Sequence, residues 1–182
     1  IDLQDYYMEH KRNQWEAYSA AKQAIVEEGK RFGEMFGREY GLMELVDMDD
    51  AELAVVALGS AAGTCKDIVA SLREQGVKAG LLKLRSFRPF PAEEIAAALK
   101  GCKAVAVMDR AASYGGGTGP LFPEVAAAMA MSGFQVPMLD YIYGLGGREL
   151  PPEQISTVYD DLAKLANGQK PEQIVQWLGV RA

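Results

Sequence analysis

The sequence predicts an α/β fold with a mostly parallel sheet that is covered by helices on both faces. Three short runs, at residues 53–58, 79–84 and 104–108, are apolar throughout except for Lys83, as is typical of strands buried on both faces. Stretches of helical periodicity separate these runs. Strands that alternate with helices through short loops form parallel sheets with right-handed crossovers.

Residues 1–41 are predicted to be a helical connector. They contain no proline, and their large apolar residues recur near multiples of a helical turn, at Trp15, Tyr18, Ile25, Phe32 and Phe36. This pattern predicts one long helix, or two helices separated near Gly29 or Gly33. A continuous helix of about 30 residues is roughly 45 Å long, so it would extend beyond a compact domain.

Residues 42–166 are predicted to form the α/β domain. Residues 42–48 are a candidate antiparallel edge strand. The first helix carries an apolar face over residues 62–72, after a tight turn capped by Ser60, and ends at Gly76. The second helix begins at Pro91 and ends at Gly101.

The rest of the domain follows the same alternation. A helix over residues 122–129 stops at Gly133, and a strand over 136–143 contains Pro137, which suits a sheet edge or a first position. Pro151 and Pro152 open a last helix, which Asn167 ends. Residues 167–182 are predicted to be a short terminal helix or tail.

The composition excludes several classes of function. The net charge is −6 and the 19 Lys and Arg are scattered, so no basic stripe for nucleic acid is expected. Neither a membrane span nor a signal peptide is predicted. The two cysteines, Cys65 and Cys102, are interpreted as small buried hydrophobes. We therefore expect a cytoplasmic protein.

Ligands of such sheets bind beyond the carboxyl ends of the strands, where this chain has loops rich in glycine and arginine. The interface or anion-site candidates are Arg88, Asp109, Arg110, Gly115, Gly116, Gly117, Gly146, Gly147 and Arg148. The run 115–120 has the glycines of an anion cradle but no P-loop lysine. We favour the interpretation that the glycines of this loop let another domain approach closely. Asp109 and Arg110 are interpreted as pairing or capping locally.

No catalytic, cofactor-binding or metal site is predicted. Residues 59–63 read G-x-A-x-G, not a dinucleotide fingerprint, and Arg85 stands where an acidic residue would hold a ribose. Ser60 lies outside a nucleophile elbow. The only histidine, His10, cannot assemble a zinc site with two distant cysteines.

Four ordered motifs resemble a known family: LGSAAGT (58–64), LRSFRPFP (84–91), SYGGGTGPLFPEV (113–125) and YIYGLGGRE (141–149). They are similar to the C-terminal part of the α subunit of pyruvate:ferredoxin oxidoreductases, within the 2-oxoacid:ferredoxin oxidoreductases. FGREYGL (36–42) resembles the joint that precedes this domain. The resemblance covers roughly residues 30–165.

The resemblance implies the transketolase C-terminal fold, a three-layer α/β/α sandwich on a five-stranded sheet with one antiparallel edge strand, here residues 42–48. It implies that residues 1–41 are a helical connector from an upstream thiamine-binding domain. In the intact family enzyme, thiamine diphosphate with Mg²⁺ decarboxylates a 2-oxoacid, and the resemblance implies that this 2-oxoacid is pyruvate. Electrons then pass through [4Fe–4S] clusters to ferredoxin, and coenzyme A takes the acyl group, in a dimeric or higher assembly of subunits.

The chain lacks residues that this chemistry requires. A [4Fe–4S] cluster takes four cysteines and the chain has two. The Gly-Asp pair of the family's thiamine diphosphate metal site occurs nowhere in the sequence. We therefore expect a structural and assembly domain that holds no cofactor and is inactive alone.

Two alternatives stay open at this point. One is the C-terminal domain of a 2-oxoacid dehydrogenase E1 β or transketolase-like subunit, which shares the L-R-x-x-R-P run but fits residues 113–125 and 144–149 poorly. The other is a stand-alone nucleotide- or coenzyme A-binding module that uses the loop 115–119.

Overall fold

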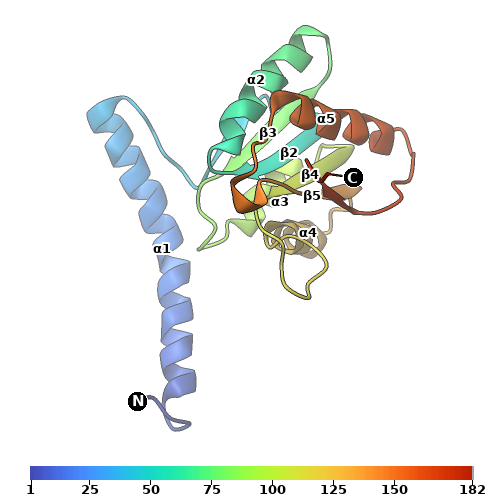
Figure 1. Cartoon of the computed structure of the whole chain (residues 1–182). Helices are drawn as coiled ribbons and strands as arrows, with labels where there is room; N and C mark the ends of the chain where they lie inside the picture. The colour runs from blue at the N-terminus through green and yellow to red at the C-terminus, as the bar shows by residue number, and fades with distance from the viewer. Residues whose placement is uncertain (182) are drawn as a thin grey trace. The chain divides into compact units, whose positions relative to one another are not determined.

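A computed structural model describes residues 1–181, which form two compact units (Figure 1). One unit contains residues 1–44 and 85–91, and the other contains residues 45–84 and the chain from residue 92 onward. No helix among residues 1–181 is both long enough and apolar enough to cross a membrane.

The first unit is dominated by one helix, α1 (Tyr7–Phe36), which runs unbroken for 30 residues. Gly37 ends it in the left-handed conformation and donates its N–H to the carbonyl of Gly33. The chain then turns back along the helix. A Cβ on Gly29 would lie 1.7 Å from the carbonyl oxygen of Tyr40. Gly29 therefore lets the returning backbone approach the helix and does not divide it.

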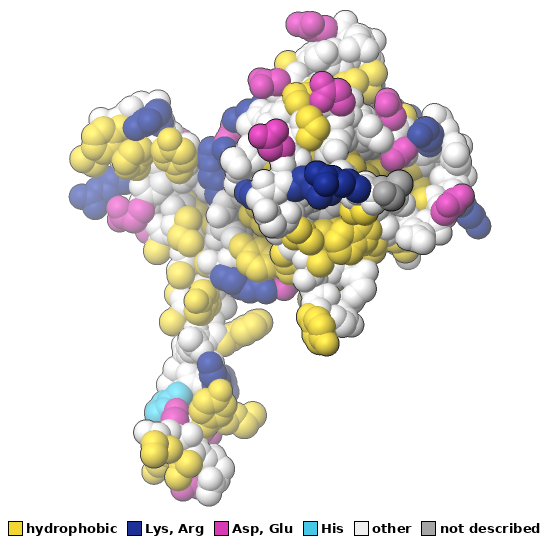
Figure 2. Space-filling view, viewed as in Figure 1, with side chains coloured by type: hydrophobic (Ala, Val, Ile, Leu, Met, Phe, Trp, Pro, Cys, Tyr) yellow, Lys and Arg dark blue, Asp and Glu magenta, His cyan; other side chains and the backbone are white. Residues whose placement is uncertain are grey.

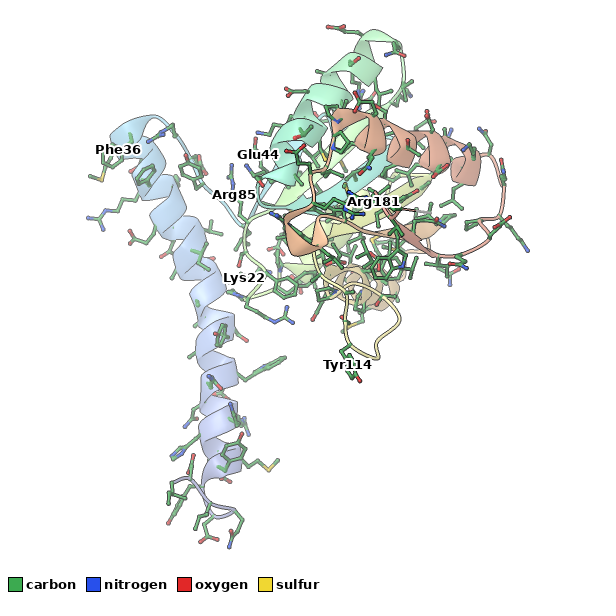
Figure 3. All side chains as sticks on the ribbon, in the orientation of Figure 1. Lys22, Phe36, Glu44, Arg85, Tyr114 and Arg181 are labelled. Atoms are coloured by element: carbon green, nitrogen blue, oxygen red, sulfur yellow. The ribbon has the colours of Figure 1, made fainter. Side chains whose placement is uncertain are left out.

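The returning segment of this unit is held by rings and a guanidinium group. The Phe32 ring lies 4.6 Å from that of Phe36 and 5.6 Å from that of Tyr40, centroid to centroid. Arg85 stacks on Tyr40 with its Cζ 4.9 Å from the ring centroid, and donates a 2.6 Å hydrogen bond to Glu44 (Figure 3). Both a cation–π contact and an ion pair thus fix Arg85.

The sheet has six strands in the order β1-β3-β2-β4-β5-β6. Their bounds are β1 Met43–Val46, β2 Leu53–Leu58, β3 Ala79–Leu84, β4 Ala104–Asp109, β5 Met138–Ile142 and β6 Val175–Trp177. Four neighbouring pairs are parallel, and the edge pair of β1 with β3 is antiparallel. The predicted α/β class and the antiparallel edge strand are confirmed.

The strand count differs from the prediction by one. β6 lies in the segment for which a short helix or tail was predicted, and it pairs with β5 through Val175, Gln176 and Trp177. A strand of three residues is too short for the alternation of apolar and polar residues to predict it. Only its hydrogen-bonded pairing with β5 identifies it as a strand.

Helices cover both faces of this sheet, which gives three layers (Figure 1). On one face, α2 (Ala61–Glu74) and α5 (Pro152–Ala166) pack together, and α3 (Ala92–Leu99) and α4 (Leu121–Met131) pack together on the other. The central strands are buried along nearly their whole length, as continuous apolar runs predict. Ser60 makes no side-chain bond to α2, so the predicted cap is wrong: its backbone is already helical.

Candidate functional site

The candidate site is the loop edge, which we define as residues 109–120 after β4 and residues 143–148 after β5. β4 and β5 are parallel neighbours, so both loops leave the sheet at the same edge. The backbone joins them directly, because the Tyr143 N–H donates a 3.0 Å hydrogen bond to the Asp109 carbonyl. Two of the sequence-predicted loops therefore form one surface.

Arg110 connects the two loops. Its Nε donates a 3.3 Å hydrogen bond to the carbonyl of Gly144. Gly144 has φ +66°, and a Cβ there would lie 3.1 Å from the Arg110 Nε. The guanidinium therefore lies over a position that requires glycine, and Arg110 is exposed at the surface of the loop edge.

The glycine loop, residues 113–120, projects from this edge. A 3.0 Å hydrogen bond from the Ser113 N–H to the Thr118 carbonyl closes it, and Gly115 and Gly117 both have positive φ. Gly115, Gly116 and Gly117 are exposed. Tyr114 stands at the tip and is fully exposed, where Figure 3 labels it and Figure 2 shows an apolar projection.

Two buried aspartates lie beneath the glycine loop. Asp109 accepts hydrogen bonds from the backbone N–H groups of Leu121 and Phe122 at 3.0 and 3.1 Å, so it caps α4. Asp140, within β5, accepts a 2.6 Å bond from the Gly119 N–H. The amides at the α4 end of the loop, those of Gly119, Leu121 and Phe122, thus donate to the protein's own carboxylates and are not open to an anion.

Sequence reasoning missed Asp140. It lies inside an apolar strand and is completely buried, which is rare for an aspartate. An acidic residue in the middle of a strand run is the one signal that could have found it.

The remaining candidates make contacts of their own. Gly146 and Gly147 lie in a short 3₁₀ turn, Leu145–Gly147, and both have positive φ. Arg148 donates to the carbonyl of Gly179, so its guanidinium is held against the C-terminal segment. Arg88 belongs to the other unit, where it is exposed and its Cζ lies 4.3 Å from the centroid of the Phe87 ring.

A hollow of about 260 Å³ lies away from the loop edge, where α5 meets the segment 169–176. In it the Tyr141 hydroxyl donates a 3.0 Å bond to Asp161, which also pairs with Lys164 at 2.7 Å. Three of its polar groups, those of Tyr141, Asp161 and Lys164, are thus bonded to one another. Throughout residues 1–181, no three His, Cys, Asp or Glu residues are grouped as metal ligands.

Residues 51–155 match the family described as "Pyruvate:ferredoxin oxidoreductase core domain II". That stretch is more than half of the chain. The chain belongs to this family.

Curated relatives agree with the assignment. The chain is 43% identical over 181 residues to a protein named "Pyruvate synthase subunit PorA" from Thermotoga maritima, covering all of this chain and 45% of that protein. It is 38% identical over 174 residues to a "Ketoisovalerate oxidoreductase subunit VorA" from Pyrococcus abyssi, covering 95% of this chain and 44% of that protein. The chain thus spans somewhat less than half the length of these relatives.

The domain II fold also occurs in a solved structure. This is a 2-oxoglutarate:ferredoxin oxidoreductase from Magnetococcus marinus, with a TM-score of 0.50 and 19% identity, over 72% of this chain and 21% of that chain. At this identity the likeness concerns the fold alone.

Proposed function

We propose that this chain is a structural and assembly domain of a thiamine-diphosphate-dependent 2-oxoacid:ferredoxin oxidoreductase that acts on pyruvate. The whole enzyme, which we call the parent, makes acyl-coenzyme A, CO₂ and reduced ferredoxin in the cytoplasm. Within it, the chain braces the cofactor-binding domains and contributes subunit contacts through α1 and the loop edge. Membership of the domain II family and the pyruvate synthase relatives support this assignment.

The observation that carries the assembly role is the surface of α1. None of its 30 residues is buried. Five of its large apolar side chains lie within about 40° of one another around the helix axis. These are Tyr7, Tyr18, Ile25, Phe32 and Phe36, which are between 36% and 56% exposed. A helix with an exposed apolar stripe suits contact with another protein surface. Other domains or subunits of the parent are the proposed partners.

The loop edge supports a role in contact over one in nucleotide binding. The first amides of α4 and the Gly119 N–H already donate to Asp109 and Asp140. A phosphate placed there would meet two buried acidic groups. The exposed Tyr114 and Arg110 instead offer a ring and a cation, which are frequent in protein interfaces.

The residues present do not fit the cofactors of the parent. A [4Fe–4S] cluster needs four cysteine ligands, whereas the chain has Cys65, which is buried in α2, and Cys102. No step of the reaction is therefore assigned to this chain. Thiamine diphosphate, Mg²⁺ and the clusters belong to other parts of the parent in this proposal.

The activity is tested on the parent, purified without air, by the reduction of a one-electron dye with pyruvate. Reduction that depends on coenzyme A is expected. Activity only with a lipoamide acceptor would overturn the proposal, and branched 2-oxoacids serve as the substrate comparison.

The assembly role is tested separately, by charge on α1. Ile25→Asp places a carboxylate in the apolar stripe and should reduce recovery of the assembled parent in size-exclusion chromatography. Ala20→Asp adds the same charge about 140° around the helix and should leave assembly unchanged. Equal behaviour of the two variants would contradict a role for this stripe.

A further inference from the structure

Two buried carboxylates face the same side of the sheet on neighbouring strands. Asp140 is paired with Val107, two residues before Asp109, so the two aspartates are diagonal neighbours on the face covered by α4. Their exposed fractions are 2% for Asp109 and 0% for Asp140. Two acidic groups this deeply buried and this close cannot both carry a negative charge without a large cost.

Gly119 lies against both of them. Its N–H donates the 2.6 Å bond to Asp140 Oδ2. A Cβ added to Gly119 would lie 2.2 Å from the Cβ and 2.4 Å from the Oδ2 of Asp109. The end of the glycine loop therefore packs against the carboxyl group of Asp109 and is hydrogen-bonded to that of Asp140.

The hydrogen bonds to the four carboxyl oxygens are unevenly distributed. Both oxygens of Asp109 accept from the Leu121 N–H, at 3.0 and 3.2 Å, and Oδ2 also accepts from the Phe122 N–H. Asp140 Oδ2 accepts from Gly119, but its buried Oδ1 has no donor among the described residues. A buried oxygen without a partner calls for an explanation, and a proton on it supplies one.

We propose that Asp140 is protonated on Oδ1 and donates a hydrogen bond to the Asp109 carboxylate, and that this shared proton holds the glycine loop against the sheet. The proton satisfies the one unpartnered oxygen and removes one of the two buried charges. Its loss leaves two carboxylates facing each other beneath Gly119, and their repulsion loosens the loop end. The glycine loop thereby responds to pH, which goes beyond the assembly role proposed above.

The protonation energetics agree with this geometry. Burial raises the pKa of Asp140 to about 6, because it and the neighbouring Asp109 carboxylate together outweigh the opposing effect of the backbone N–H groups of Gly119 and Tyr141. Burial also raises the pKa of Asp109, but its hydrogen bonds from Leu121, Phe122 and Asp140 oppose that effect. Asp140 is thus the proton carrier and Asp109 the acceptor.

Few other ionisable groups can perturb the pair. On the α4 side of the sheet are Glu124, in the first turn of α4, and Glu93 and Glu94 of α3. Arg110 follows Asp109 and extends to Gly144. On β5, the ionisable side chains Tyr141 and Tyr143 belong to the opposite, α2 and α5 face, as does Cys65 of α2. Only the Asp109 charge acts directly on Asp140.

Asparagine substitution separates the two roles. In Asp140→Asn, the amide carbonyl can accept from Gly119 while the NH₂ group donates to Asp109, which mimics the protonated acid. In Asp109→Asn, the NH₂ group faces the N–H groups of α4 and loses acceptor capacity. We expect Asp140→Asn to preserve the arrangement at every pH, and Asp109→Asn to weaken it at every pH.

The first readout is the thermal midpoint of the chain between pH 4 and pH 8. The folded pKa of Asp140 exceeds its unfolded value near 4, so the folded state binds more protons between these values and stability falls as pH rises through about 6. The wild type should lose several degrees relative to Asp140→Asn over this range. A difference in thermal midpoint between the wild type and Asp140→Asn that is the same at pH 4 and pH 8 would overturn the proposal.

The second readout does not depend on stable variants. The side-chain carboxyl carbon of Asp140 should titrate near pH 6 in the NMR spectrum of the wild type, and the Gly119 amide signal should move with the same midpoint. Titration of Asp140 below pH 4.5, or a Gly119 amide that ignores the transition, would contradict the shared proton.

Discussion

The phenolic hydroxyl of Tyr159 on α5 donates a 2.9 Å hydrogen bond to the backbone carbonyl of Gly80 on β3. Tyr159 is 2% exposed, so neither group has water as an alternative partner. The bond fixes α5 over the sheet at a point where Gly80 has no room for a side chain, since a Cβ there would lie 2.7 Å from Ala51 and Met48.

Tyr159→Phe should therefore destabilise the chain by about 1–3 kcal/mol, because the Gly80 carbonyl would stay buried without its donor. Chemical denaturation measures this loss. Tyr114→Phe removes the same hydroxyl from a fully exposed ring and should change stability little. Similar losses in both variants would mean that the buried bond contributes nothing specific.

Gly119→Ala should strongly destabilise the α/β unit. The added methyl group would lie 2.2–2.4 Å from three atoms of Asp109, and the surrounding backbone has little room to move. Thermal unfolding should show a clear fall in the midpoint. Gly63→Ala is the control: its Cβ would meet nothing within 4 Å inside α2, and alanine is the better helix former there. A neutral Gly119→Ala would refute the close packing beneath the glycine loop.

Arg73→Lys should also be destabilising, although it preserves the charge. The Arg73 guanidinium donates to the carbonyls of Ala79 and Asp47 and, at 2.6 Å, to the Asp50 carboxylate. An ammonium group cannot reproduce this planar fork, so a loss of about 1–2 kcal/mol is expected in urea unfolding. The matched change Arg12→Lys, in a single exposed pair with Glu16, should be close to neutral.

Both thiols should react slowly in the folded chain. Burial raises the pKa of Cys65 to about 12 and that of Cys102 to about 11, and only the thiolate reacts. At pH 8 each thiolate fraction is then below about 0.1%, compared with roughly a quarter for a free cysteine. Mass spectrometry after iodoacetamide should find both cysteines unmodified in buffer and alkylated in urea. Rapid labelling of Cys65 in buffer would contradict its burial.

The sequence was sufficient for the features that local pattern determines. The runs at 53–58, 79–84 and 104–108 are apolar except at Lys83 because both faces of those strands are covered, and each is a strand in the structure. Pro151 and Pro152 likewise mark the start of α5. A strand that is buried on both faces has apolar residues at consecutive positions, so it can be predicted without knowledge of its distant partners.

Features that depend on distant partners were out of reach. Gly29 suggested a helix break, but the structure shows that it makes room for the backbone of Tyr40, eleven residues later. Asp140 was unremarkable until the β4–β5 register placed it beside Asp109 and Gly119. The prediction that Asp109 caps locally agrees with the hydrogen bonds that it accepts from α4. No residue near Asp109 in the sequence, however, indicates that Asp140 is its neighbour.

β6 has a practical consequence for anyone who expresses this domain. The family match ends at residue 155, inside α5, but the sheet continues to Trp177. A recombinant fragment trimmed to the family boundary would leave β5, whose residues are almost all buried, as a bare edge with unpaired backbone groups. Such an edge recruits other chains, so the trimmed fragment should aggregate, and its insolubility would reflect the cut and not the domain.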